Sequence, residues 1–327
     1  MATKPSGILY LSRADVEAAA PSMPEIIAAV EAAFVEKGHG RAEMPPKPGI
    51  HTGPNAFIHA MPAFLPALRA AGIKWISGYP ENPKRGLPYI SGLLILNDPD
   101  TGFPIAVMDA TWITAMRTGA ASAVAAKYLA RPDASALAIL ACGAQGRSNL
   151  LGLREVCPNL TTVLAYDINP AAQEAYVTEM KQRTGLEVVG VASPREAVCE
   201  ADLIATSGPI IKDPKPVIPA AWFRKGAFAV ALDYDSYWKP EALAAADKFC
   251  TDDLPQLNYY RSLGYFKNLP DIYADLAEIV IGAKPGRERD DERCFAMHLG
   301  LAIEDLATAP LVLARARELG LGTPLAL

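Results

Sequence analysis

The stretch Ala136-Leu-Ala-Ile-Leu-Ala-Cys-Gly-Ala-Gln-Gly146 decides the fold of this 327-residue chain. An apolar run at residues 136–142 leads through a glycine-containing turn into residues 145–157, which have the pattern of a helix. A strand, a glycine-rich turn and a helix N-terminus together present free backbone N–H groups and the positive end of a helix dipole. That arrangement is typical of a pyrophosphate-binding turn, so the stretch predicts a Rossmann dinucleotide-binding domain.

An acidic residue follows at the distance that such a domain requires. The second strand, residues 162–166, ends at Asp167, 24 residues after Gly143. An acid at this point binds the adenosine ribose hydroxyls and repels a 2′-phosphate, and no arginine follows it directly, so NAD(H) is favoured over NADP(H). The fingerprint is imperfect, because Ala141 stands where the first glycine of Gly-x-Gly-x-x-Gly is expected. The alternative is a glycine-containing turn that binds nothing.

Two different patterns of elements divide the chain. From residue 135 strands alternate with helices, with strands expected at 162–166, 188–191, 203–206 and 228–232, which indicates a parallel sheet. Before residue 130 the chain has strand patterns at 7–11, 57–61, 73–79, 90–97 and 104–109 and helix patterns after Ser12 and at 24–36 and 111–129. A proline- and glycine-rich loop or edge segment is expected at 43–56, and a long helical tail at 292–319.

Composition excludes several classes of protein. The chain is 51% apolar and 20% charged, with a net charge of −5, which fits a globular protein and argues against a nucleic-acid partner. There is no uninterrupted apolar run of about 18 residues, and residues 1–10 have no apolar signal-peptide core, so we expect no membrane partner and a cytoplasmic location. The five dispersed cysteines favour reduced thiols, and the four histidines lack metal-ligand spacing, so we expect no metal site.

The chain resembles the ornithine cyclodeaminase/mu-crystallin family over nearly its whole length. The matching pieces are Met61-Pro62, Gly72-Ile-Lys74, Asn82 with Gly86-Leu-Pro88, Leu96-Asn-Asp98 with Gly102-Phe-Pro-Ile-Ala106, Asp109, Thr114-Ala-Met-Arg117-Thr-Gly-Ala-Ala121, Gly143-Ala-Gln145, Asp235-Ser-Tyr-Trp-Lys-Pro-Glu241, and Leu276-Ala-Glu-Ile279 with Gly282 and Gly286-Arg287. The resemblance implies a substrate-binding and dimerisation domain built from both chain ends, residues 1–130 and 301–327. It also implies an inserted Rossmann domain, residues 131–300, and a homodimer.

The resemblance also implies a reaction. Its members pass a hydride between nicotinamide and the α-carbon of an amino acid or of the matching imine, so we expect an NAD(H)-dependent amino-acid dehydrogenase or imine reductase. Two alternatives stay open: a cyclodeaminase in which NAD is reduced and reoxidised in one turnover, and a mu-crystallin-like protein that binds the cofactor with little catalysis. The substrate would be a small amino acid, 2-oxo acid or imine.

Site residues carry over by position. Lys74 and Arg117 match the family's carboxylate-binding and catalytic cations, and Asp235 matches its acid/base aspartate, although Asp233 competes for that role. Lys47 or Arg41 is a candidate for a second carboxylate contact, and Asp305 is as readily a helix cap. The expected cofactor residues are Thr118, Gly143, Ala144, Gln145, Gly146, Asp167, Ser207 and Gly208.

One position departs from ornithine cyclodeaminase. That enzyme has a glutamate just before Met-Pro that holds the distal amino group of ornithine, whereas this chain has His59. A histidine is a poor partner for an ammonium group and suits a neutral or anionic side chain better, although it could also be a structural histidine in a strand. We therefore expect that ornithine is not the main substrate.

Overall fold

A computed structural model describes residues 7–53 and 55–327. Residues 1–6, where no signal peptide is expected, lie outside the described residues. The chain separates into two compact units, one built from residues up to Arg117 together with Leu301–Leu327, and the other from Thr118–Gly300. Both ends of the chain therefore build the first unit, and the second is an insertion.

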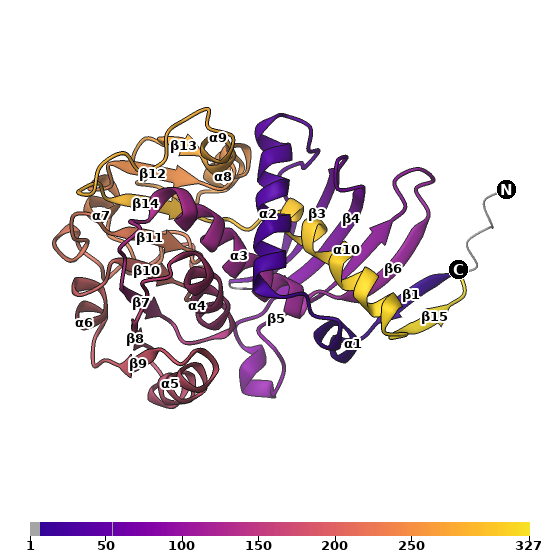
Figure 1. The fold of residues 1–327 in the computed structure, drawn as a ribbon, viewed down its shortest axis with the longest axis horizontal. Helices are drawn as coiled ribbons and strands as arrows, with labels where there is room; N and C mark the ends of the chain where they lie inside the picture. Colours follow the sequence, from indigo (N-terminus) through magenta and orange to yellow (C-terminus); the bar gives the residue numbers. More distant parts are fainter. Residues whose placement is uncertain (1–6, 54) are drawn as a thin grey trace. The chain divides into compact units, whose positions relative to one another are not determined.

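The first unit contains a seven-stranded sheet with helices on one face (Figure 1). Its strand order is β15-β1-β6-β5-β4-β3-β2, in which β1 runs parallel to β6 and the other neighbours are antiparallel. Helix α10 packs against α2 and against β3 and β4. The elements are β1 (Ile8–Leu11), α1 (Arg13–Ala18), α2 (Met23–Gly38), β2 (Gly49–Gly53), β3 (Ala56–Leu65), β4 (Ala70–Gly78), β5 (Ile90–Asn97), β6 (Pro104–Asp109), α10 (Ala302–Glu318) and β15 (Thr323–Leu325).

The two faces of this sheet differ because side chains alternate along each strand. One cross-strand row is fully buried; its members are Met61, Lys74, Leu94, Met108 and Leu11. The neighbouring row points to the other face, and its largely apolar side chains are partly buried or, at Tyr10, exposed; its members are Pro62, Ile73, Ile95, Val107 and Tyr10. The buried row contains one charged residue, Lys74, and this places its ammonium group inside the unit.

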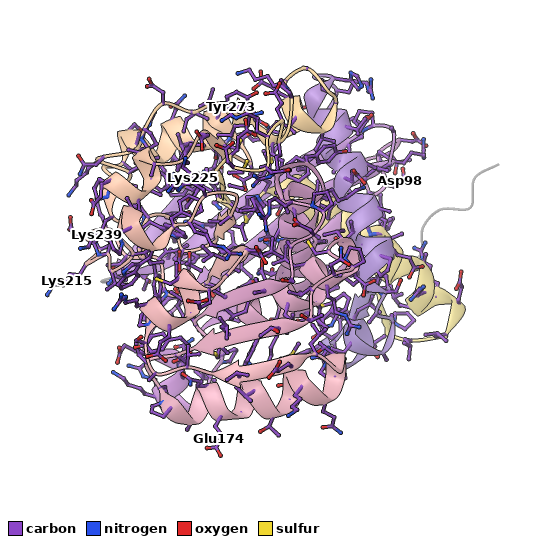
Figure 2. All side chains as sticks on the ribbon, turned by 60° about the vertical axis from the view of Figure 1, so that its left-hand side comes forward. Asp98, Glu174, Lys215, Lys225, Lys239 and Tyr273 are labelled. Atoms are coloured by element: carbon purple, nitrogen blue, oxygen red, sulfur yellow. The ribbon has the colours of Figure 1, made fainter. Side chains whose placement is uncertain are left out.

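The second unit contains an eight-stranded sheet in which all neighbours are parallel, in the order β13-β12-β14-β11-β10-β7-β8-β9. Crossover helices connect the strands, as parallel pairing requires. The elements are β7 (Ala136–Leu140), α4 (Ala144–Val156), β8 (Thr162–Tyr166), α5 (Pro170–Thr184), β9 (Glu187–Gly190), α6 (Pro194–Cys199), β10 (Leu203–Thr206), β11 (Phe228–Ala231), α7 (Pro240–Ala244), β12 (Lys248–Thr251), α8 (Leu254–Ser262), β13 (Ala274–Asp275), α9 (Leu276–Val280) and β14 (Cys294–Met297). Exposed charges of both signs, such as Glu174 and Lys215, extend from its surface (Figure 2).

One expected element is wrong. Residues 292–319 do not form one long helix, because Cys294–Met297 is β14, a strand paired on both sides in the middle of the second sheet. Helix α10 begins only at Ala302, after the turn at Gly300, where φ is 77°. The four strand residues are all buried, so they show no alternation of polar and apolar residues that would separate a strand from a helix.

The boundary between the units also lies earlier than residue 130. Helix α3 (Thr111–Leu129) continues from the first unit into the second, and residues 118–130 belong to the second. The reason is a close helix contact: a Cβ on Gly119 would lie 2.1 Å from the backbone oxygen of Ser148, and a Cβ on Gly152 would lie 2.2 Å from that of Gly119. Two glycines therefore let α3 pack directly against α4.

Candidate functional site

Lys74 and Arg117 meet at an acid pair on α10, which we define as Glu304 and Asp305. The Nζ atom of Lys74 lies 2.6 Å from Asp305 Oδ2, and Arg117 Nε donates to Asp305 Oδ1 at 3.0 Å. Arg117 Nη1 donates to Glu304. All four side chains are at most 6% exposed. The two cations expected from the sequence thus form one buried ion-pair cluster within the first unit.

A third cationic side chain acts on this cluster. Lys47, on the segment before β2, is also buried, and its charge acts on both Lys74 and His59. Burial, with a further contribution from Arg117, lowers the pKa of Lys74 to about 7, although Asp305 opposes this shift. A lysine with such a pKa can both hold and release a proton near neutral pH.

His59 is neutral in this environment. It lies on β3, its ring stacks on Phe57 with centroids 4.3 Å apart, and burial together with the charge of Lys47 lowers its pKa to about 3. A neutral imidazole can form hydrogen bonds but offers no charge to a substrate. Arg41, the alternative to Lys47, instead binds Glu36 through Nε at 2.9 Å and is half exposed.

In the second unit, the turn after β7 is shaped for a close approach. Ala141, in the position of the missing glycine, has a φ of 77°, which is the left-handed conformation that a glycine would adopt easily. Gly143 begins α4, and a Cβ there would meet nothing within 4 Å, so the space above the turn is open. Gly146 is buried, and a Cβ there would lie 2.6 Å from the oxygen of Ala141. These features fit a pyrophosphate at the N-terminus of α4, beside Gly143, Ala144 and Gln145.

Asp167 is held at the end of β8. Its Oδ2 accepts a hydrogen bond from Cys142 N at 2.7 Å and its Oδ1 accepts one from Asn169 N at 2.8 Å. The carboxylate is therefore fixed beside the glycine turn, and the exposed Ile168 follows it rather than an arginine. This arrangement fits the ribose of an NAD molecule.

Asp233 and Asp235 differ in their surroundings. Asp233 is fully buried; it accepts hydrogen bonds from Thr206 Oγ1 and Gly208 N, both at 2.8 Å, and burial raises its pKa to about 7. It thus joins the loops that follow β10 and β11. Asp235 is only partly buried, and this burial raises its pKa. These contacts suit Asp233 to holding the loops, and Asp235 remains the predicted acid/base.

The remaining expected cofactor residues lie in the same unit. Ser207 Oγ donates to the oxygen of Ala141 at 3.1 Å, which joins the end of β10 to the glycine turn. Gly208 lies against Tyr237, because a Cβ there would be 2.6 Å from the tyrosine ring. Thr118 is buried in α3. The assignment of these residues to the cofactor stays a prediction.

Sequence reasoning missed the role of the α10 acid pair. Asp305 seemed as suited to capping as to function, but it is Glu304 whose Oε2 accepts from Leu301 N, at 3.2 Å, while Asp305 binds both cations. Two adjacent acids inside the apolar stretch 299–313 were the available signal, since buried acids require partners.

Other kinds of site find no support within residues 7–53 and 55–327. No group of three or more His, Cys, Asp or Glu residues in that part of the chain could hold a metal ion. None of the helices described is long and apolar enough to cross a membrane. The five cysteines are free thiols.

Comparison with known proteins gives the family. Residues 9–320 match the model of the ornithine cyclodeaminase/mu-crystallin family. The chain belongs to this family. It is 37% identical to the alanine dehydrogenase of Archaeoglobus fulgidus, over 96% of this chain and 97% of that protein.

Two solved structures agree in fold. The Δ1-pyrroline-2-carboxylate reductase of Thermococcus litoralis, in complex with NADH and L-proline, has a TM-score of 0.88 and 38% identity, covering 97% of this chain and all (100%) of that one. An archaeal alanine dehydrogenase dimer with bound NAD has a TM-score of 0.87 and 36% identity, covering 98% and 99%. The expected family and Rossmann-type fold are confirmed, and these relatives support the expected class, an NAD-linked oxidoreductase.

Proposed function

We propose that this protein is an NAD(H)-dependent amino-acid dehydrogenase or imine reductase that acts on a small 2-amino acid or its imine. The observation that carries the proposal is the buried cluster of Lys74 and Arg117 in the first unit. Lys47, whose charge acts on both Lys74 and His59, adds a third cationic side chain near this cluster, and His59 is neutral. Cationic side chains suit a substrate carboxylate, and Arg117 suits it best because a guanidinium binds a carboxylate in a bidentate manner.

The chain's own residues then have distinct roles. Arg117 and Lys47 hold the carboxylate, and His59 contacts a short uncharged side chain of the substrate. Lys74 polarises the imine or its carbonyl counterpart, and Asp235 gives a proton to the substrate nitrogen in reduction and takes it back in oxidation. When bound, NADH would supply the hydride that the imine carbon needs, and the proton from Asp235 completes the reduction at the nitrogen. Asp167 and the turn at Gly143 hold the dinucleotide.

The direct test offers candidate substrates to the purified protein and follows NADH absorbance. We expect NADH loss with a 2-oxo acid plus ammonia or methylamine, or with a cyclic imine acid, and NADH formation with the matching amino acid plus NAD⁺. A cyclodeaminase would release ammonia with no net change in NADH, and a binding protein would bind NADH without turnover. Either result would replace this proposal.

His59 sharpens the choice of substrate. L-Ornithine with NAD⁺ should give little proline and ammonia, because a neutral imidazole offers no counter-charge to a distal ammonium. Efficient conversion of ornithine would overturn this part of the proposal.

The partner we propose is a second copy of the same chain. The sheet face opposite α10 is apolar across five strands, and Trp75 and Leu93, which are cross-strand partners on it, remain 48% and 44% exposed. An apolar face of this kind usually marks an interaction surface. The free cysteines likewise support a cytoplasmic location as a proposal.

Charge on this face should separate the copies. We expect the wild-type protein to be a dimer by light scattering and Trp75→Arg to be a folded monomer, because an arginine cannot be buried there without a partner. Glu174→Arg, on an exposed part of α5, is the matched control and should stay dimeric. A wild-type monomer would contradict the proposal.

A further inference from the structure

The α10 acid pair does more than neutralise two buried cations. Asp305 has one oxygen on each of them: Oδ2 lies 2.6 Å from Lys74 Nζ, and Oδ1 accepts from Arg117 Nε at 3.0 Å. A single carboxylate therefore sets the spacing between the two charged groups. Glu304 accepts a hydrogen bond from a second guanidinium nitrogen of Arg117, so α10 fixes two of the three guanidinium nitrogens. Because a guanidinium is planar, two such contacts define the orientation of the whole group.

The acid pair is itself held rigidly. Both carboxylates lie in the first turns of α10, where the positive end of the helix dipole stabilises negative charge. Glu304 Oε2 accepts from Leu301 N at 3.2 Å, and the backbone oxygen of Glu304 accepts from Thr308 Oγ1 at 2.9 Å. Helix α10 packs on β4, which carries Lys74, and both acids are 0% exposed. Solvent therefore cannot replace these contacts.

The α10 acid pair lies far along the sequence from Lys74 and Arg117. The acids follow the whole inserted unit, so Asp305 lies 188 residues after Arg117. The cations come from β4 and α3, and only the returning C-terminal segment brings the counter-charges to them. The cation cluster of the first unit is therefore complete only when α10 is in place.

We infer that Asp305, supported by Glu304, is a positioning residue that aligns Lys74 and Arg117 for the substrate and stabilises the ammonium form of Lys74. The alignment for a substrate rests on the proposed function, whereas the effect of Asp305 on Lys74 does not depend on it. The charged and titratable groups that face Lys74 are Asp305 from α10, Arg117 from α3, Lys47 from the segment before β2 and His59 from β3. Of these, Asp305 is the one whose charge favours the ammonium form. Removing that charge should therefore lower the pKa of Lys74 further.

The experiment measures Lys74 directly. The ¹³Cε resonance of Lys74, identified by its loss in Lys74→Met, is titrated in the full-length protein without substrate. Relative to wild type, we expect the Lys74 pKa to fall by about one to three pH units in Asp305→Asn, because an adjacent opposite charge shifts a pKa by that amount. Asp305→Glu keeps the charge, so the pKa of Lys74 in this variant should be close to its wild-type value. Glu25→Gln is the matched control. Glu25, on α2, pairs with Arg315 of α10, which follows the acid pair by more than two helical turns. Loss of the Glu25 charge should therefore leave the pKa of Lys74 unchanged.

Turnover and cofactor binding complete the test. In Asp305→Asn, kcat/KM for the imine should fall about 100-fold, since small misplacements of binding groups cost that much, and its alkaline limb should move to lower pH. The Kd for NADH should stay the same. If Lys74 titrates in folded Asp305→Asn as in the wild type, the inference is wrong and the pair is only structural. If Asp305→Asn does not fold, turnover of Asp305→Glu and Glu304→Gln decides, because a longer carboxylate side chain or the loss of the Glu304 charge should displace the two cations: a wild-type kcat/KM in both variants would also overturn the inference. If the wild type reduces no imine but the Lys74 titration shifts as expected, the proposed function fails while the positioning of Lys74 stands.

Discussion

Lys74 of the first unit and Asp233 of the second are both fully buried, and burial brings the pKa of each to about 7 from opposite directions. The partners of the two residues differ. Lys74 lies in an ion pair with Asp305 beside another cation, whereas Asp233 accepts hydrogen bonds from a neutral hydroxyl and a backbone N–H. One unit thus holds fixed charges and the other holds a carboxyl group in a neutral network.

The difference indicates which unit has which task. Fixed cations are suited to holding a substrate carboxylate, since they are already oriented before the substrate binds. A carboxyl group in a neutral network is suited to holding loops together. Its partly buried neighbour Asp235 does not share those hydrogen bonds and is suited to exchanging a proton with the substrate.

The largest effect should come from Asp235→Asn. We expect kcat to fall about 100- to 10,000-fold, the usual contribution of a general acid or base, while the NADH Kd and the melting temperature stay near those of the wild type. The measurement is NADH turnover together with NADH fluorescence titration.

Asp233→Asn provides the contrast at the neighbouring acid. It should lower the melting temperature and weaken NADH binding, because Gly208 N and Thr206 Oγ1 lose the carboxylate that joins their loop to β11. If Asp235→Asn keeps full activity and Asp233→Asn abolishes kcat without loss of stability, the two roles are exchanged.

A smaller effect concerns stability and pH. The pKa of Lys74 is lower in the folded chain, about 7, than its ordinary value of 10.5, so between these values the unfolded chain binds more protons. The contribution of Lys74 to the free energy of unfolding is therefore fully present above pH about 10.5 and is lost as the pH falls toward 7. Relative to Lys74→Met, wild-type stability should rise with pH by up to about 1.4 kcal/mol per pH unit in this window. Urea unfolding of both proteins at several pH values checks the slope, and parallel curves would contradict it.

Most of the fold was predictable because local patterns decide it. Strands β5, β6, β8 and β10 and helix α3 have the expected bounds, since turns with Gly, Pro or Asp delimit them. Strand β14 was not predictable in this way: its four residues are buried on both faces and have no alternation to read. The boundary after Arg117 depends on the contact of Gly119 with α4, which is a tertiary feature and not a local one.

The site was predictable in its cations but not in their partners. Lys74 was notable as a charge between apolar residues in a strand, and such a residue must be either at the edge of the sheet or paired. Its partner Asp305 lies 231 residues further along the chain, on an element that begins only after the second unit ends. No spacing rule joins residues so far apart; the pairing of α10 with β4 does so, and it exists only in the folded unit.

The smallest effect should come from the glycine turn, where the second unit departs from the usual fingerprint. Ala141 has a φ of 77°, and a left-handed conformation costs a residue with a Cβ about 1–2 kcal/mol relative to glycine. Glycine in turn costs roughly 0.5–1 kcal/mol more to order on folding. Ala141→Gly should therefore stabilise the protein by about 0 to 1.5 kcal/mol, seen as a melting temperature up to a few degrees higher. The main chain of the turn already has the shape that glycine would adopt, so the Kd for NADH should not change. A destabilised Ala141→Gly, or one with altered NADH affinity, would mean that the alanine methyl group has a role in the turn beyond substituting for glycine.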